Sequence, residues 1–221
     1  VAIVIGAVSG VGLIGLAMLL LFAAGAYEVT AYRGLDSGLW GVASVILIAA
    51  TLEEVVFRCL LFQILETAFG TLPSLWLQSL VFALLHIANI EDRANTQEVV
   101  TTVVSGTLLG AFWTLVFVHT RNLWATAANH AAWNFTIILA GVPLSGLDHW
   151  LRVAPIASQY RGPAWLTGGV GGPEDSLVTI VLVAASLAFM LYWAKIRNRL
   201  LRAGAAGVDS PSPPHRDSHH G

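Results

Sequence analysis

Three polar clusters interrupt long apolar stretches of the sequence, and their side chains are those used in acid–base chemistry. They are the segments 53–58 (EEVVFR), 82–86 (FALLH) and 129–134 (NHAAWN). A charged side chain at the centre of a bilayer costs at least about 2.5 kcal/mol, so such groups usually pair with each other or face a wet cavity. The clusters therefore predict a polar site within apolar helices.

Helical geometry gives the two adjacent glutamates different roles. Glu54 and Arg58 are four residues apart, so they share one helix face and are expected to form a structural ion pair. Glu53 is rotated by about 100° from Glu54. Its own neighbour one turn on is Phe57, which offers no counter-charge. Glu53 is therefore the candidate general base.

The other two clusters supply imidazoles and an amide. His130 and Asn134 are also four residues apart and should project together, whereas His86 lies on a separate helix. If these helices are neighbours, Glu53, His86, His130 and Asn134 meet around one small polar cavity. A carboxylate beside an imidazole can activate water, and a second imidazole with an amide can stabilise an oxyanion. Phe82 is expected to pack there and keep the cavity dry.

A metal centre is the open alternative for the same residues. Glu53, His86 and His130 are three candidate ligands of a catalytic zinc or other divalent metal, with the fourth position left for water. The sequence contains neither the H-E-x-x-H spacing of zinc proteases nor a G-x-S-x-G nucleophile motif. No cofactor is therefore certain from sequence alone.

Composition indicates what kind of elements must position these residues. Hydrophobic residues make up 56% of the chain and charged residues 11%, with a mean hydropathy of +0.73. Soluble domains carry about 25% charged residues, so the lipid bilayer is the expected surrounding. The net charge of −2 gives no indication of a nucleic-acid partner. The single cysteine, Cys59, excludes a disulfide within the chain.

Apolar stretches of about 20 residues predict an all-α, polytopic transmembrane helix bundle with about six spans and a polar intramembrane cavity. The expected spans are 2–26, 39–67, 72–90, 99–118, 123–142 and 177–194. Residues 1–195 would form this helical domain, with its motif core at about 47–140, and residues 196–221 a basic, disordered tail. Basic residues after Ala194 place that tail in the cytoplasm by the positive-inside rule, with the protein in the plasma membrane.

The ordered set E-E-x-x-x-R, F-x-x-x-H and H-x-x-x-N, each on its own apolar helix, resembles the CPBP family. This family includes type II CAAX prenyl endopeptidases and relatives linked to bacteriocin processing or abortive infection. The resemblance implies an intramembrane glutamate-dependent protease, often catalogued as a metalloendopeptidase, which acts on hydrophobic or lipidated peptides. It implies that Glu53 activates water with help from His86. His130 and Asn134 would stabilise the oxyanion, while Glu54 and Arg58 would hold the site in shape.

Two other classes of protein remain open at this stage. A transporter or proton relay would use Glu53, His86 and His130 as titrating stations. A non-catalytic immunity protein would bind a toxin in the membrane without needing Glu53. The loss of proteolysis on Glu53→Gln separates the protease from both alternatives.

Overall fold

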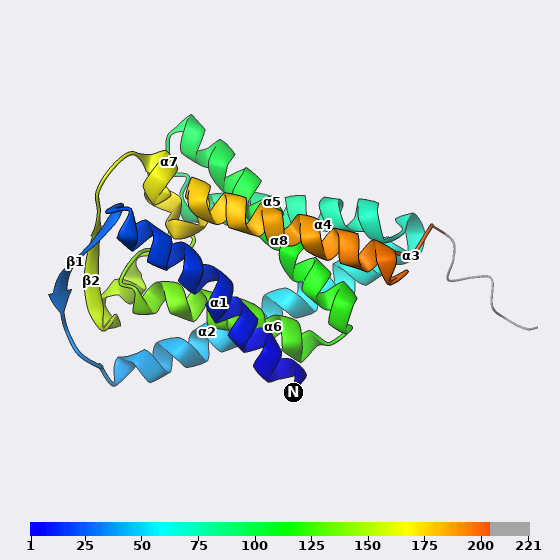
Figure 1. Cartoon of the computed structure of the whole chain (residues 1–221), viewed down its shortest axis with the longest axis horizontal. Helices are drawn as coiled ribbons and strands as arrows, with labels where there is room; N and C mark the ends of the chain where they lie inside the picture. The colour runs from blue at the N-terminus through cyan, green and yellow to red at the C-terminus, as the bar shows by residue number, and fades with distance from the viewer. Residues whose placement is uncertain (204–221) are drawn as a thin grey trace, which may run out of the picture.

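The structure of the protein, a computed structural model, describes residues 1–203 and consists mostly of helices packed along one axis (Figure 1). Seven helices follow the six apolar stretches expected from the sequence, because α2 and α3 both lie in the second stretch. They are α1 (Ala2–Ala23), α2 (Gly38–Glu54), α3 (Gln63–Phe69), α4 (Thr71–His86), α5 (Thr96–Thr120), α6 (Leu123–Leu139) and α8 (Leu177–Ile196).

Side-chain caps and a glycine fix where several of these helices begin and end. The Asn95 side chain accepts hydrogen bonds from the first turn of α5, and Glu98 completes a capping box. Ser176 caps α8 through the Thr179 backbone N–H. Gly70, at φ 79°, separates α3 from α4 in a conformation that favours glycine. The boundaries are therefore set by local chemistry readable in the sequence.

The second helical pass departs from the regular helix assumed in the sequence analysis. Between α2 and α3 the chain forms a π-helix, η1 (Val55–Phe62), which begins directly after Glu54. π-helical turns within α-helices often occur at functional sites. Arg58 nevertheless reaches Glu54, as the spacing predicted.

A small antiparallel sheet corrects the all-α expectation. β1 (Tyr27–Tyr32) pairs with β2 (Ile156–Tyr160), with Tyr27 opposite Tyr160. Figure 1 shows both strands at one end of the bundle, near α7 (Ala164–Thr167). Both strands lie in segments that the sequence analysis left between the expected spans. It did not predict their pairing, because the two strands are distant in sequence. Short helical turns complete the connections: η2 (Ile87–Asn89), η3 (His149–Val153), η4 (Gly169–Gly171) and η5 (Pro173–Asp175).

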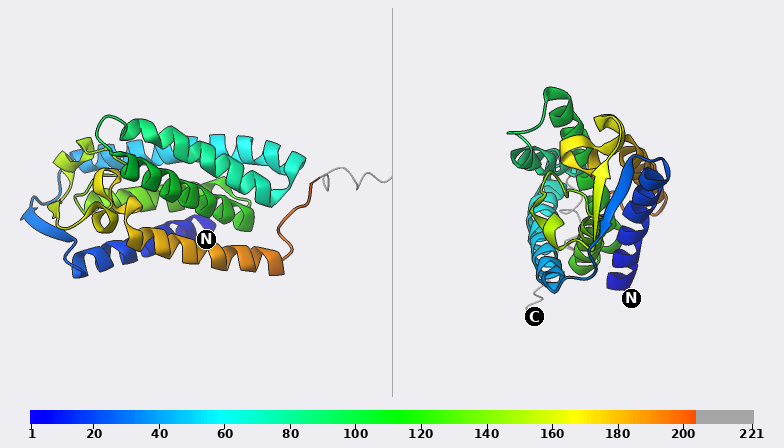
Figure 2. Two further views of the ribbon diagram at one scale, coloured as in Figure 1. Left: turned by 90° about the horizontal axis from the view of Figure 1, so that it is seen from above. Right: turned by 90° about the vertical axis from the view of Figure 1, so that its left-hand side faces the viewer.

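Small residues let the helices approach closely. α1 packs extensively on α6, and a Cβ added at Gly6 or Gly10 would lie 2.2 or 2.3 Å from a backbone oxygen of Ala125 or Asn129. α4 and α5 pack in the same way, with Gly110 against Ser79. Close backbone approach through small residues is typical of helix packing in membranes. The left view of Figure 2 shows α4 on one side of the molecule and α1 and α8 on the other, with α5 between them.

Within residues 1–203, four helical segments are long and apolar enough to cross a membrane, so the expected count of six is not confirmed. They are Ala2–Ala23, Thr71–Asn89, Thr96–Thr120 and Leu177–Ile196. α2 and α6 each contain 17 residues, at the lower limit for a span, and α2 continues directly into η1 and α3. Both carry the polar side chains that define the site.

The first residues of the predicted tail contact the helical domain. Thr71 donates its backbone N–H to the Leu201 carbonyl oxygen (3.0 Å), and Leu201 N–H donates to the Thr71 hydroxyl (2.8 Å). The chain after α8 therefore packs on the start of α4. The remainder of the predicted tail, residues 204–221, lies outside the described residues.

Candidate active site

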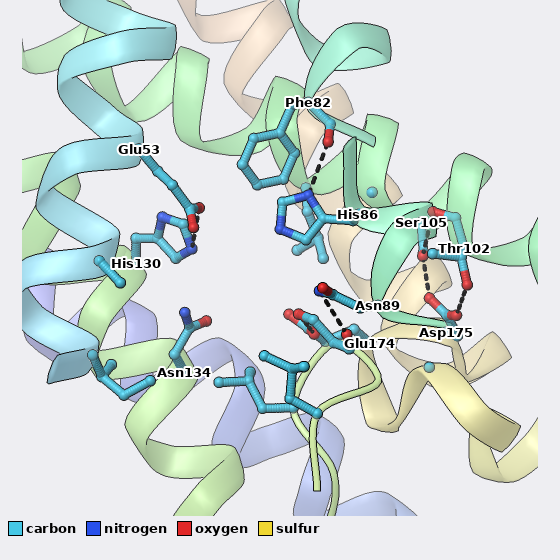
Figure 3. Close-up of a pocket in the computed structure, with 18 of the residues that line it drawn as sticks. Glu53, Phe82, His86, Asn89, Thr102, Ser105, His130, Asn134, Glu174 and Asp175 are labelled. Carbon is cyan, nitrogen blue, oxygen red and sulfur yellow. Dashed lines mark hydrogen bonds and ion pairs between the residues drawn. The ribbon is translucent and has the colours of Figure 1, made fainter. Parts of the chain in front are cut away.

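The four residues predicted to act together line one cavity of about 140 Å³ (Figure 3). Glu53 comes from the end of α2, His86 from the end of α4, and His130 and Asn134 from α6. One water molecule occupies about 30 Å³ in the liquid, so the cavity has room for several. Three helices that are separate in sequence thus bring the predicted quartet to one place.

The second glutamate is engaged in a buried ion pair. Glu54 Oε2 lies 3.2 Å from Arg58 Nε, and both side chains are fully buried. The Nε hydrogen does not point at the oxygen, so the contact is an ion pair without a formed hydrogen bond. Arg58 also donates from Nη2 to the Gly110 carbonyl oxygen (2.9 Å), and its guanidinium carbon lies 5.1 Å from the centroid of the Phe82 ring. This cation is therefore neutralised and packed.

Glu54 also fixes the orientation of His130. The distance from His130 Nδ1 to Glu54 Oε1 is 2.9 Å, and because an ionised carboxylate only accepts hydrogen bonds, Nδ1 carries the hydrogen. The imidazole stacks on Trp113 with centroids 3.7 Å apart. This arrangement turns Nε2 toward Glu53, whose Oε2 lies 3.8 Å away.

His86 is fixed from its own helix. Its Nδ1 lies 2.8 Å from the Phe82 carbonyl oxygen, which can only accept, so Nδ1 donates. The neutral imidazole then presents an unprotonated Nε2. Phe82 packs against the ring with centroids 4.3 Å apart and is itself buried, as expected of a packing residue. His86 can thus accept a hydrogen bond in the cavity.

The remaining polar atoms of the quartet have no hydrogen-bond partner among residues 1–203. Glu53 Oε2 and Asn134 Oδ1 are buried oxygens of this kind. The Glu53 side chain is 35% exposed, whereas that of Glu54 is fully buried, so the two glutamates face different surroundings. Buried polar atoms are normally satisfied, and the described residues leave these two oxygens of cavity-lining side chains without a donor.

The zinc alternative does not fit this geometry. Among the described residues, no three His, Cys, Asp or Glu side chains are grouped so that they could hold a metal ion. Glu53, His86 and His130 line the same cavity, and the Nδ1 hydrogen bonds of the two imidazoles leave both Nε2 atoms unengaged, but the three side chains are not grouped closely enough to share one ion.

The sequence analysis missed two acidic residues in the cavity wall. Glu174 and Asp175, in η5, are both 4% exposed and line the cavity. Ser105 and Thr102 of α5 both donate hydrogen bonds to Asp175. Burial raises the pKa of the Asp175 carboxyl from 3.8 to about 6, and these two hydrogen bonds oppose that rise. The Pro-Glu-Asp run directly before an apolar helix was the one signal in the sequence.

The fold and the site together define a helical membrane protein with a Glu, His, His and Asn cavity. Residues 35–136 match the family model described as Rce1-like, type II CAAX prenyl endopeptidase Rce1-like. The match confirms the resemblance to the CPBP family and supports a CAAX-type intramembrane protease as the general class. With the apolar helices, it indicates an integral membrane protein. Searches of curated proteins and of solved structures found no match.

The matched segment contains the whole predicted quartet. It ends at residue 136, before β2, η5 and α8. Glu174 and Asp175 therefore belong to a part of the cavity wall that the family model does not cover.

Proposed function

We propose that the protein is an intramembrane endopeptidase that hydrolyses a peptide bond with a water molecule activated by Glu53. The observation that carries the proposal is the convergence of Glu53, His86, His130 and Asn134 on one cavity from three helices. The family match over the same residues supports the class of reaction. Glu54 and Arg58 are supporting residues that hold this arrangement.

Glu53 is the general base of the proposed reaction. Its partner-free Oε2 takes a proton from water, and the water oxygen attacks the carbonyl carbon of the scissile bond. The protonated Glu53 then gives that proton to the leaving nitrogen as the carbon–nitrogen bond breaks. The products are a carboxylic acid and an amine, and the carboxyl group of Glu53 returns to its starting state.

The histidines divide the remaining work according to their hydrogen bonds. His86 Nε2 accepts a hydrogen bond from the attacking water and orients it, because Nδ1 is committed to Phe82. His130, protonated between Glu54 and Glu53, donates from Nε2 to the developing oxyanion. The Asn134 amide supplies a second donor. Preorganised donors of this kind typically contribute about 10²-fold or more to the rate.

The proposed substrates are hydrophobic or lipidated peptides, including CAAX-type C-terminal segments, that reach the cavity from the bilayer. Lipid surrounds the apolar helices, and the proposed location is the plasma membrane with the C-terminus in the cytoplasm. This orientation follows from the basic residues after α8 and stays a prediction.

The test compares purified wild type with Glu53→Gln on a quenched-fluorescent farnesylated CAAX peptide in detergent. Removing a general base should lower the rate by about 10²- to 10⁴-fold. Glu91→Gln, in the exposed loop after α4, is the matched control and should cleave as wild type does. Full activity of Glu53→Gln would refute the proposal. A parallel assay with a chelator tests whether activity depends on a metal.

A further inference from the structure

The two acidic residues in the cavity wall are held by neutral groups alone. Glu174 accepts hydrogen bonds from Trp133 Nε1 (3.0 Å) and from the Ser145 hydroxyl. Asp175 accepts from the hydroxyls of Thr102 and Ser105. None of these four donors carries a charge, so the two carboxylates keep their negative charge uncompensated by their hydrogen bonds.

Within residues 1–203, neither carboxylate forms an ion pair, and no lysine or arginine lines the cavity. The nearby start of α8 supplies only the partial positive charge of a helix N-terminus. Aspartate and glutamate are rarely this buried without a charged partner, because removing a lone charge from water is costly. Glu54, by contrast, is buried together with a charged partner, Arg58.

The same cavity presents further acceptors that need donors. Figure 3 shows Glu53, His130 and Asn134 on one side, Thr102, Ser105 and Asp175 on the other, and Glu174 between them below His86. The buried oxygens of Glu53 and Asn134 have no partner among the described residues. Among residues 1–203, three carboxylates line the cavity, and the basic side chains in its lining are two imidazoles. A ligand rich in N–H donors and carrying positive charge fits this lining.

We propose that the cavity binds a basic side chain of the substrate, lysine or arginine, with Glu174 and Asp175 as its specificity-determining residues. This inference rests on the proposed endopeptidase function and adds a substrate class to it. The cation of the substrate supplies the counter-charge that the two carboxylates lack. Each carboxylate oxygen has two lone-pair sites, so Glu174 can accept an N–H of the cation and keep its hydrogen bonds from Trp133 and Ser145. An anionic side chain at the same position of the substrate is repelled by the two carboxylates.

The first experiment measures binding and is independent of catalysis. Full-length Glu53→Gln protein in lipid nanodiscs is titrated with fluorescent apolar peptides that differ only in one central residue: arginine, its uncharged isostere citrulline, or glutamate. We expect the arginine peptide to bind at least about thirtyfold more tightly than the citrulline peptide, because a desolvated, hydrogen-bonded charge pair is lost in the latter. Glu174→Gln and Asp175→Asn, each added to Glu53→Gln, should reduce the difference in affinity between the arginine and citrulline peptides.

Asp148→Asn is the matched control. Asp148 is an acid of the same connecting segment whose side chain is 62% exposed, and it should leave the arginine preference unchanged. Equal binding of the arginine and citrulline peptides overturns the inference. So does an arginine preference that persists in both acidic-wall variants. Unfolding curves of every variant separate loss of binding from loss of fold.

Two further arms distinguish the occupant and the function. If CaCl₂ or MgCl₂ alone stabilises wild type and not Glu174→Gln, while the two peptides bind equally, an inorganic cation fills the site and the inference fails. Wild-type cleavage of the arginine and citrulline peptides at equal rates overturns the substrate class and leaves the endopeptidase intact. Arginine-selective binding without cleavage of any peptide refutes the endopeptidase and retains the cationic site.

Discussion

The buried pair of Glu54 and Arg58 gives the sharpest prediction about what holds the site together. Glu54→Gln removes the charge that neutralises Arg58 but keeps an oxygen that can accept from His130 Nδ1. Arg58 then retains two kinds of partner, the Gly110 carbonyl oxygen and the rings of Phe57, Phe82 and Trp113. Breaking one side of a buried ion pair typically costs 3–5 kcal/mol. Because those partners remain, we expect a loss of about 3 kcal/mol.

Arg58→Met is the reciprocal change. It leaves the buried Glu54 carboxylate with the hydrogen bond to His130 Nδ1 but without the guanidinium that neutralised it. We expect a loss of similar size, about 3 kcal/mol. The double variant Glu54→Gln/Arg58→Met leaves neither charge unpaired, so its loss should fall short of the sum of the single losses by at least about 2 kcal/mol.

The assay is equilibrium unfolding in mixed micelles of mild detergent and SDS, followed by fluorescence of the eight tryptophans. Glu91→Gln, an exposed loop acid, should change stability by less than about 0.5 kcal/mol. Strictly additive losses in the double variant would show that the two side chains are not coupled. The argument that Glu54 and Arg58 neutralise each other would then be wrong.

Three other predictions concern packing, pH and catalysis. Gly10→Val should destabilise the protein by at least about 1–3 kcal/mol in the same unfolding assay, because its Cβ meets the backbone of α6. Gly12→Ala meets nothing within 4 Å and should be neutral or stabilising. The raised pKa of Asp175 means that the folded state binds this proton more tightly than the unfolded chain, so stability falls as pH rises from about 4 to 6. That fall in stability is at most about 3 kcal/mol. It should be shallower in Asp175→Asn than in wild type, and a steeper fall in the variant would contradict the prediction. Asn134→Ala should lower kcat by about 10²-fold with little change in KM, and a purely KM effect would exclude an oxyanion role.

The chemistry of the site was largely readable from the sequence. Charged residues inside apolar stretches are conspicuous because lipid penalises them, and spacing of four residues fixes which side chains share a helix face. Those two facts paired Glu54 with Arg58 and separated them from Glu53, and the structure has both features. The helical stretches were readable for a similar reason, since hydropathy and caps are local properties.

Other features of the fold were not readable from local sequence. β1 pairs with β2 only because α1 and the segment after α6 end on the same side of the bundle. Nothing in either strand's own sequence specifies its partner. The π-helical turn after Glu54 was not predicted by the four-residue spacing either, which assumes a regular α-helix.

The cavity itself shows the division between the two sources of information most clearly. The sequence determined that a glutamate, two histidines and an asparagine lie on apolar helices, because the hydropathy of the residues next to them in the chain predicts those helices. Only the tertiary structure decided that these residues meet, that His86 and His130 are turned by Phe82 and Glu54, and that the three proposed metal ligands are not grouped for a metal. It also brought Glu174 and Asp175 into the same cavity, because hydrogen bonds from α5 and α6 draw a distant connection inward.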